Sequence, residues 1–574
     1  MRVLLVNLTR FGDLLQSQSG ISALCDDGHE VALVCLDNFA SATALLRGIK
    51  TVFPLHGGHL LKSMEHCENE QTSMSPSWVE GFGGLVSWRE NLWRQFAPDV
   101  VINCTPFLSA KLLSRFLAKD RLVFGFGVDA NGFGDNRGQW ASLLQGAKGL
   151  RGASPFNVAD VFRAMMLGAV DAEPLRANRE GVAKEICQQS EADVDNTDRL
   201  EAFLPGALAR PAEDALKAML LHLEFMQPPE MAGDVRGYVA LQLGASEKRR
   251  QWPVASFAAI GRQCWQEYGL CPVLLGSKAE KELAHSYAAC TDSPFVSLCG
   301  ETSLPELASA LCCCKLLLTN DTGTMHLAAG LNVPVFAIFL ATAQPFDTGP
   351  CLPGSYSFEP DMDCHPCAFG VACPHDNACR DAITSEIVWS FISRYLAGAP
   401  SASCITGDGA KIKTRVWRTA RQTDGTLFLE SFSGHGDTDR AVWFAAQQVF
   451  LGEFLAGKGA VQLNSVQLSA AGAQEARADV ATILGYMTLL EKQGEVLGVR
   501  AVPAMRAKFL QSWGAVTEAI CRSRWIAALG PIWMDDTQKE GQNMAQTLAI
   551  ISQYRKLLGK IADALETTLQ DRSE

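Results

Sequence analysis

The sequence lacks three features that would assign the protein to a familiar class. No window reaches ~18 consecutive apolar residues, the length that a membrane-spanning helix needs, so we expect no transmembrane helix. The apolar run at the N-terminus is short and interrupted by Asn7 and Arg10, unlike a secretory signal. Excess positive charge is also missing: the net charge is -12, whereas a nucleic-acid-binding protein needs a basic face against the phosphates. We therefore expect a cytoplasmic protein with no nucleic-acid partner, and contact with a membrane surface stays open.

The length of the chain indicates at least two domains. Single cores rarely grow beyond ~300 residues, and this chain has 574, of which 48% are hydrophobic and 20% charged. Those proportions are ordinary for folded domains. The 19 cysteines are spread along the chain without an export signal, so we expect mostly reduced, buried thiols rather than a disulfide framework.

The first part of the chain alternates between strand and helix patterns. Short apolar runs at residues 2–6, 30–35 and 99–104 are typical of buried parallel strands, and residues with helical spacing follow the first and third runs. This βαβ pattern predicts a doubly wound, Rossmann-like α/β domain over residues 1–232. The polar stretch at residues 56–78 is expected to form an inserted surface loop.

The same pattern returns in the second part, which predicts a second Rossmann-like domain over residues 233–399. Two doubly wound domains that face a cleft are the leading architecture. Strands are expected at residues 237–244, 271–277, 295–300, 315–321 and 333–339.

The pattern changes over residues 400–574, for which we predict a hairpin plus a helical bundle of unknown role. Residues 416–433 alternate around Asp424-Gly425, a pair that favours a tight turn. Helices are expected at residues 438–456, 468–494, 503–529 and 537–570.

Asp13 is the first candidate for chemistry, because it follows the first strand and lies near the start of the next helix. Open α/β folds place ligands at this edge of the sheet. Gly12 is expected to permit a tight turn there. The Asp13 carboxylate could accept a proton from a hydroxyl, or it could simply cap the helix.

Two further strand ends carry polar residues. In the loop of residues 244–253, Ser246 and Arg250 offer a hydroxyl and a guanidinium to phosphate oxygens, unless the loop is merely basic and solvated. Glu280 is suited to the hydroxyls of a nucleotide ribose, or it is an ordinary acidic residue of a helix's first turn.

Residues 319–330, TNDTGTMHLAAG, form the strongest candidate. Capping residues and a glycine precede a helix here, so the amides at its start would point at an anion. The histidine in the first turns could reach a phosphate or a sugar hydroxyl, or it could pack behind a structural cap. The candidate residues are Asp321, Thr322, Gly323, Thr324 and His326.

Four cysteines within residues 364–379 could hold a structural zinc ion, because zinc takes tetrahedral thiolate ligands. The spacing of the second pair, five residues rather than two, argues against zinc, and no catalytic role is expected for a metal. The four are Cys364, Cys367, Cys373 and Cys379.

These motifs, in this order, resemble glycosyltransferase family 9, the heptosyltransferases of lipopolysaccharide core assembly. The resemblance covers about residues 1–398 and does not extend over the rest of the chain. The matching stretches are RFGDLLQS, PDVVINCTPFLSAKLL, QLGAS with RQWP, VLLGSKAE, and NDTGTMHLAAGLNVPVFAIF with a following TGP.

The resemblance implies a GT-B fold that binds its acceptor mainly in the first domain and its donor in the second. It implies an inverting, metal-independent transfer of a sugar from a nucleotide diphosphate donor, expected to be ADP-heptose, with no cofactor required. Asp13 would then be the base. Ser246 and Arg250 would contact the diphosphate, although the family commonly has Lys at the position of Arg250.

The remaining donor contacts also follow from the resemblance. Glu280 would contact the nucleoside and Asp321 the donor sugar, while Thr322, Gly323 and His326 would hold phosphates and neighbouring sugar oxygens. Thr324 belongs to the same donor-binding set.

The implied acceptor is a lipopolysaccharide or another lipid-linked molecule, which would bring the protein to the cytoplasmic face of the inner membrane. Residues 56–78 and the C-terminal extension depart from the family and leave the acceptor open. Two other functions stay open as well. One is a non-catalytic nucleotide-sugar-binding module that interacts through its extension, and the other is a nucleotide-sugar epimerase on a similar fold.

Overall fold

The computed structural model divides into two compact units, each of which combines stretches distant in sequence. Unit 1 comprises Met1–Ala141, Val158–Gly244 and Phe257–Val335, and unit 2 comprises Ser142–Asn157, Ala245–Ser256 and Phe336–Glu574. The predicted domain boundaries stay a prediction. The structure describes residues 1–57, 76–147, 152–172, 206–227, 234–399, 413–457, 463, 466–500, 502–539 and 543–571.

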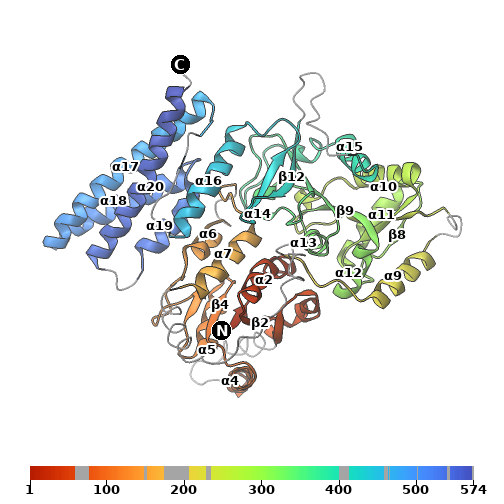
Figure 1. The fold of residues 1–574 in the computed structure, drawn as a ribbon, viewed down its shortest axis with the longest axis horizontal. Helices are drawn as coiled ribbons and strands as arrows, with labels where there is room; N and C mark the ends of the chain where they lie inside the picture. Colours follow the sequence, from red (N-terminus) through yellow and green to blue (C-terminus); the bar gives the residue numbers. More distant parts are fainter. Residues whose placement is uncertain are drawn as a thin grey trace, which may run out of the picture. The chain divides into compact units, whose positions relative to one another are not determined.

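The first sheet lies in unit 1, where Figure 1 labels β2 and β4. It is parallel throughout, with the strand order β3-β2-β1-β4-β5. All three predicted strands are confirmed. Edge strand β3 was not predicted, because a lysine and a proline interrupt its apolar pattern; proline is tolerated at a sheet edge. The strands are β1 Arg2–Val6, β2 Glu30–Leu36, β3 Ile49–Leu55, β4 Val100–Asn103 and β5 Val123–Gly125.

Helices connect these strands. Most of the predicted loop at residues 56–78 lies outside the described residues, but its last residues already belong to a helix that begins at Pro76. The helices are α1 Phe11–Gln16, α2 Gln18–Asp26, α4 Pro76–Gln95, α5 Leu108–Ala118, α6 Gln139–Ala147, α7 Val158–Val170 and α9 Glu213–Phe225, with the 3-10 helix η1 Asp37–Leu45.

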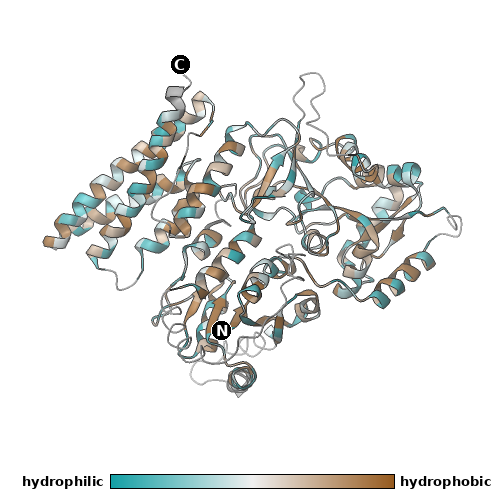
Figure 2. Cartoon of the chain, in the orientation of Figure 1, coloured by the Kyte–Doolittle hydropathy of each residue, from teal (hydrophilic) through white to brown (hydrophobic). Residues whose placement is uncertain are grey.

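The second sheet has the strand order β13-β12-β11-β10-β9-β6-β7-β8. All five predicted strands are confirmed, although β8 is only two residues long. Figure 2 shows apolar residues along the strands of both sheets, as expected for strands that are buried on both faces. The strands are β6 Gly237–Gln242, β7 Leu270–Leu275, β8 Val296–Ser297, β9 Cys314–Asn320, β10 Val335–Ile338, β11 Tyr356–Pro360, β12 Thr414–Arg421 and β13 Leu427–Ser431.

The helices of this region follow the strands in the predicted alternation. A capping box starts one of these helices, with Ser303 and Glu306 bonding reciprocally. The helices are α10 Val254–Tyr268, α11 Lys281–Cys290, α12 Leu304–Cys312, α13 Gly323–Gly330, α14 Pro345–Thr348 and α15 Ser385–Leu396, with the 3-10 helices η4 Lys248–Arg250, η5 Lys278–Glu280 and η6 Ala378–Arg380.

The predicted hairpin is confirmed, and it extends the second sheet within unit 2. Strands β12 and β13 pair antiparallel, and Gly425 takes a positive φ of 86° in the turn. β12 also pairs antiparallel with β11. β11 was not predicted, because its sequence YSFEP contains a serine, a glutamate and a proline, yet all five residues are buried.

A buried ion cluster joins β11, β12 and the next helix within unit 2. The Glu359 side chain on β11 is 0% exposed. Its Oε1 accepts hydrogen bonds from Arg440 Nη1 (2.7 Å) and Trp417 Nε1 (2.9 Å), and its Oε2 lies 3.1 Å from His365 Nε2. Burial raises the pKa of Glu359, but the charge of Arg440 and the bond to His365 outweigh it and hold that pKa well below its usual range.

The C-terminal region is mainly helical, as predicted, but two expected helices differ in their bounds. The helix expected at residues 537–570 begins at Met544. The helix expected at residues 503–529 ends at Arg522, and a separate helix begins at Gly530 with Pro531 in its first turn, where proline is tolerated. Helices α17, α18 and α20 lie side by side (Figure 1). The helices are α16 Asp439–Leu455, α17 Ala470–Val499, α18 Pro503–Arg522, α19 Gly530–Thr537 and α20 Met544–Asp571, with the 3-10 helix η7 Ala527–Leu529.

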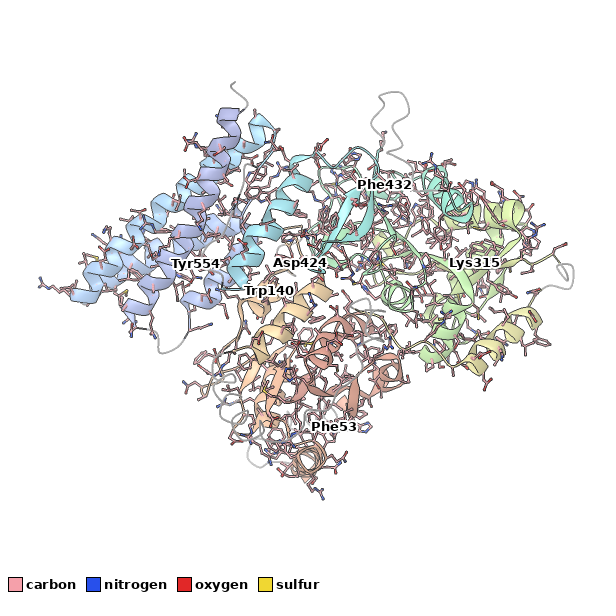
Figure 3. All side chains as sticks on the ribbon, in the orientation of Figure 1. Phe53, Trp140, Lys315, Asp424, Phe432 and Tyr554 are labelled. Atoms are coloured by element: carbon pink, nitrogen blue, oxygen red, sulfur yellow. The ribbon has the colours of Figure 1, made fainter. Side chains whose placement is uncertain are left out.

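Large aromatic side chains fill the core of this helical region. Tyr554 of α20, labelled in Figure 3, packs edge-on against Trp533 at 5.2 Å between ring centroids and donates to Asp536 Oδ2 (2.9 Å). Trp443 of α16 packs edge-on against Trp525. None of the described helices is both long and apolar enough to cross a membrane.

The predicted fold class is therefore confirmed. The structure contains two doubly wound, Rossmann-like α/β sheets and a mainly helical C-terminal region, while the GT-B-like arrangement around a cleft stays a prediction.

Candidate functional site

Polar side chains meet at the carboxyl ends of β6, β7 and β9 in unit 1. Gln242, the last residue of β6, joins two neighbours: Thr324 Oγ1 donates to Gln242 Oε1 (3.2 Å), and Gln242 Nε2 donates to Glu280 Oε1 (3.1 Å). Open α/β sheets bind ligands at this edge. We call Gln242, Glu280 and Thr324 the edge cluster.

Two nearby residues shape the edge cluster. Asn320 Nδ2 donates to the main-chain oxygens of Leu243 (2.8 Å) and Gly244 (3.2 Å), which ties the end of β9 to the loop after β6. A Cβ on Gly244 would lie 1.4 Å from Glu280 Oε1, so glycine leaves room for that carboxylate. Gln242 is absent from the predicted site residues, although an amide that ends the apolar strand GYVALQ is a usable signal.

Glu280 has a structural role in the edge cluster. Its Oε2 accepts a hydrogen bond from the Ser277 N–H (2.6 Å) in a capping box, while its Oε1 holds Gln242. This agrees with the alternative stated for Glu280, an acidic residue of a helix's first turn. Its contact with a nucleoside stays a prediction.

The candidate segment Asp321 to His326 lies at the start of α13, as the sequence predicts. Thr322 is the N-cap residue with extended φ and ψ of -144° and 168°, and it makes no side-chain cap to the helix among the described residues. Thr322 Oγ1 lies 3.2 Å from Thr319 Oγ1 instead. The first backbone N–H groups of α13 therefore do not donate to the side chain of the N-cap residue. An anionic group would suit them.

Asp13 lies in the first turn of α1 and is half-buried. The N-cap residue is Arg10, so the capping alternative for Asp13 is wrong. The expected tight turn at Gly12 is also wrong, because Gly12 lies inside the helix. A Cβ there would lie 3.0 Å from His326 Cδ2 and 3.3 Å from Gly323 Cα, so glycine lets α1 approach α13 closely.

His326 is buried at this contact between helices of unit 1. Its Nε2 lies 3.2 Å from Gln16 Nε2, and the two residues are 8% and 5% exposed. Burial lowers the pKa of His326 from 6.5 to about 4, and the charge of Asp321 opposes that shift only in part. The imidazole is therefore neutral near pH 7 and can both donate and accept a hydrogen bond.

Ser246 and Arg250 are brought together in unit 2, in the loop that precedes α10. Arg250 Nη1 donates to Ser246 Oγ (2.9 Å). The adjacent Arg249 pairs with Glu247 (2.7 Å) and donates to the main-chain oxygen of Val371 (2.8 Å). Arg249 therefore supports the loop, whereas Arg250 places a guanidinium beside a hydroxyl, a combination that suits phosphate oxygens.

The four candidate zinc ligands are present as free thiols. Cys373 Sγ accepts a hydrogen bond from the Asn377 N–H (3.3 Å), and burial raises the pKa of the Cys379 thiol. Within the described ranges, no group of three or more His, Cys, Asp or Glu side chains is placed to hold a metal ion. Cys364, Cys367, Cys373 and Cys379 as placed do not fit a zinc ion, and the zinc site stays a prediction.

Comparison with known proteins gives a family for the segment that contains most of these residues. Residues 204–369 match the profile of glycosyltransferase family 9 (heptosyltransferase). This segment belongs to glycosyltransferase family 9. The family 9 segment contains the edge cluster, α13 and the loop with Ser246 and Arg250, so the resemblance predicted from the sequence is confirmed over residues 204–369.

Curated relatives of the family 9 segment match over short stretches. Lipopolysaccharide heptosyltransferase 2 of Escherichia coli strain K12 is 32% identical over 101 residues, which are 17% of this chain and 29% of that protein. Lipooligosaccharide heptosyltransferase 2 of Campylobacter jejuni is 28% identical over 117 residues, which are 20% of this chain and 36% of that protein. The chain thus spans about a third of the length of these relatives.

Solved structures align more widely but with low similarity. The glycosyl transferase family 9 protein from Veillonella parvula has 15% identity and a TM-score of 0.47, covering 69% of this chain and 98% of that one. The E. coli ADP-heptose lps heptosyltransferase II has 16% identity and a TM-score of 0.46, covering 69% and 99%. At these scores the likeness adds no argument about function.

Proposed function

We propose that the protein is an inverting glycosyltransferase. It moves a heptose or a related sugar from a nucleotide diphosphate donor, ADP-heptose, to a lipopolysaccharide core-like acceptor. The observation that carries the proposal is the family 9 match over the segment with the edge cluster and α13. The lipid-linked acceptor would bring the protein to the cytoplasmic face of the inner membrane.

In the proposed reaction, Asp13 takes the proton from the attacking acceptor hydroxyl. That oxygen forms a bond to the anomeric carbon as the bond to the donor phosphate breaks, and the nucleoside diphosphate leaves. Ser246 and Arg250 hold the leaving diphosphate, and the first amides of α13 with Thr322 and Gly323 bind phosphate or sugar oxygens. Asp321 contacts the donor sugar, and His326 holds phosphate and neighbouring sugar oxygens. Thr324 belongs to the same donor-binding set, and Glu280 contacts the nucleoside.

The test measures sugar transfer from ADP-heptose to extracted lipopolysaccharide core acceptors. Asp13→Asn keeps the size of the side chain but removes the base, so we expect kcat to fall by about 10²–10⁴-fold with donor binding unchanged by calorimetry. Asp26→Asn, at an exposed position of α2, is the matched control and should keep wild-type kcat. Equal kcat for wild type and Asp13→Asn would remove Asp13 from the mechanism.

The same assay separates the alternatives. A binding module would hold ADP-heptose without product on any acceptor. An epimerase would convert a nucleotide sugar when no acceptor is present. Acceptor-dependent product whose anomeric configuration is opposite to that of the donor, read by NMR, supports the inverting transferase.

A further inference from the structure

Helices α1 and α13 touch at two glycines in unit 1. A Cβ on Gly12 would lie 3.3 Å from Gly323 Cα, and a Cβ on Gly323 would lie 2.8 Å from the Phe11 ring. A side chain at either glycine would force a neighbour to move. The contact therefore fixes the distance between the helix that carries Asp13 and the helix that carries His326.

Gln16 and His326 meet inside this contact. Gln16 Nε2 lies 3.2 Å from His326 Nε2, and both residues are buried. Gln16 Oε1 and His326 Nδ1 have no hydrogen-bond partner among the described residues. Buried polar atoms are normally paired, and the exceptions call for an explanation such as a catalytic role.

We propose that Gln16 is a positioning residue for the transfer reaction. Its amide donates to His326 Nε2, which places the ring proton on Nδ1 and fixes the rotation of the imidazole. The same bond holds α1, with Asp13, against the donor-binding start of α13. This inference rests on the proposed function.

Stability alone does not explain a glutamine at this position. A leucine has nearly the same volume and would leave no buried amide oxygen unpaired, but it would leave His326 Nε2 without its partner. Each unpaired buried group costs about 1–3 kcal/mol, so the two effects are of similar size and should nearly cancel. A purely structural role therefore predicts that Gln16→Leu preserves folding and activity. A positioning role predicts preserved folding with impaired catalysis.

The experiment compares Gln16→Leu with the full-length wild-type protein in the transfer assay. We expect a melting temperature close to that of the wild type, unchanged donor Kd, and kcat lowered by about tenfold or more, because small misplacements of reacting groups reduce rates strongly. The matched control is Gln18→Leu. Gln18 is also buried, but its amide bonds Ser22 and the main chain of Arg47, so this variant should lose stability and keep kcat per folded molecule.

A second readout does not depend on activity. The ¹⁵N shifts of the His326 ring, assigned with His326→Gln, should report the Nδ1-protonated tautomer in the wild type and a mixture of tautomers in Gln16→Leu. An unchanged tautomer, or an unchanged kcat, would overturn the proposal. Absence of transfer by the wild type would instead overturn the proposed function, while the tautomer would still test the Gln16–His326 bond.

Discussion

The buried polar cluster around Glu359 in unit 2 and the buried Gln16–His326 pair in unit 1 differ in the bonds that hold them together. In unit 2 both oxygens of Glu359 have partners, supplied by Arg440, Trp417 and His365, while His365 Nδ1 and Gln344 Nε2 have none in the described part of the chain. In unit 1 the Gln16–His326 pair leaves one atom of each side chain without a partner in the described part of the chain. Both clusters therefore keep unpaired polar atoms, but the Glu359 cluster is built on an ion pair that holds β11 to α16, whereas the Gln16–His326 pair is uncharged and lies between α1 and α13.

The difference also bears on the C-terminal region. Arg440 lies in the first turn of α16, and its guanidinium is anchored by Glu359 and by Gln344 Oε1 (2.9 Å). The ion cluster thus connects the helical region to the second sheet within unit 2. We infer that this part of the extension supports the fold.

Arg440→Met is expected to have the largest effect on stability. It leaves the Glu359 carboxylate buried without its strongest cation, and breaking a buried pair costs about 3–5 kcal/mol. Chemical denaturation measures the loss. The control is Arg477→Met, which breaks an exposed pair with Glu566 and should cost less than about 1 kcal/mol. Equal losses in the two variants would contradict a structural role for the cluster.

His326 should make the stability of unit 1 depend on pH. The unfolded chain takes up the proton near pH 6.5 and the folded protein only near pH 4, because burial lowers the pKa of His326. Stability is therefore fully present above pH 6.5 and falls toward pH 4, by about 3 kcal/mol for this one group. Denaturation at pH 6.5 and pH 4 should show a smaller fall in His326→Gln, and an equal fall would contradict the buried neutral ring.

Gly244→Ala tests the edge cluster and should have the smallest effect. The new methyl group would displace Glu280 Oε1 and break its bond to Gln242, at a cost of about 1 kcal/mol. In a Glu280→Ala background the methyl group has room, so the same substitution should cost nothing there. A cost that persists in that background would mean that Gly244 matters for another reason.

Regular periodicity made much of the fold predictable. The strands at residues 2–6, 30–35 and 99–104, the five strands of the second βα region and the hairpin at Asp424-Gly425 all form. β11 escaped prediction because a charged residue in a strand normally indicates exposure, whereas here Glu359 is buried by partners from other elements.

The candidate site was likewise predictable from the sequence only in part. The sequence by itself determined which loops follow which strands, and hence that the segments of Asp13, Glu280 and Asp321 begin or lie near helices after strands. Only the tertiary structure decided what those segments touch. Gln16 and His326 are 310 residues apart in the sequence, yet their side chains lie in contact. Gln242, Glu280 and Thr324 lie at the ends of three different strands and are joined by hydrogen bonds. Local patterns report which side chains are buried, but the partners that pair buried polar atoms come from chain packing.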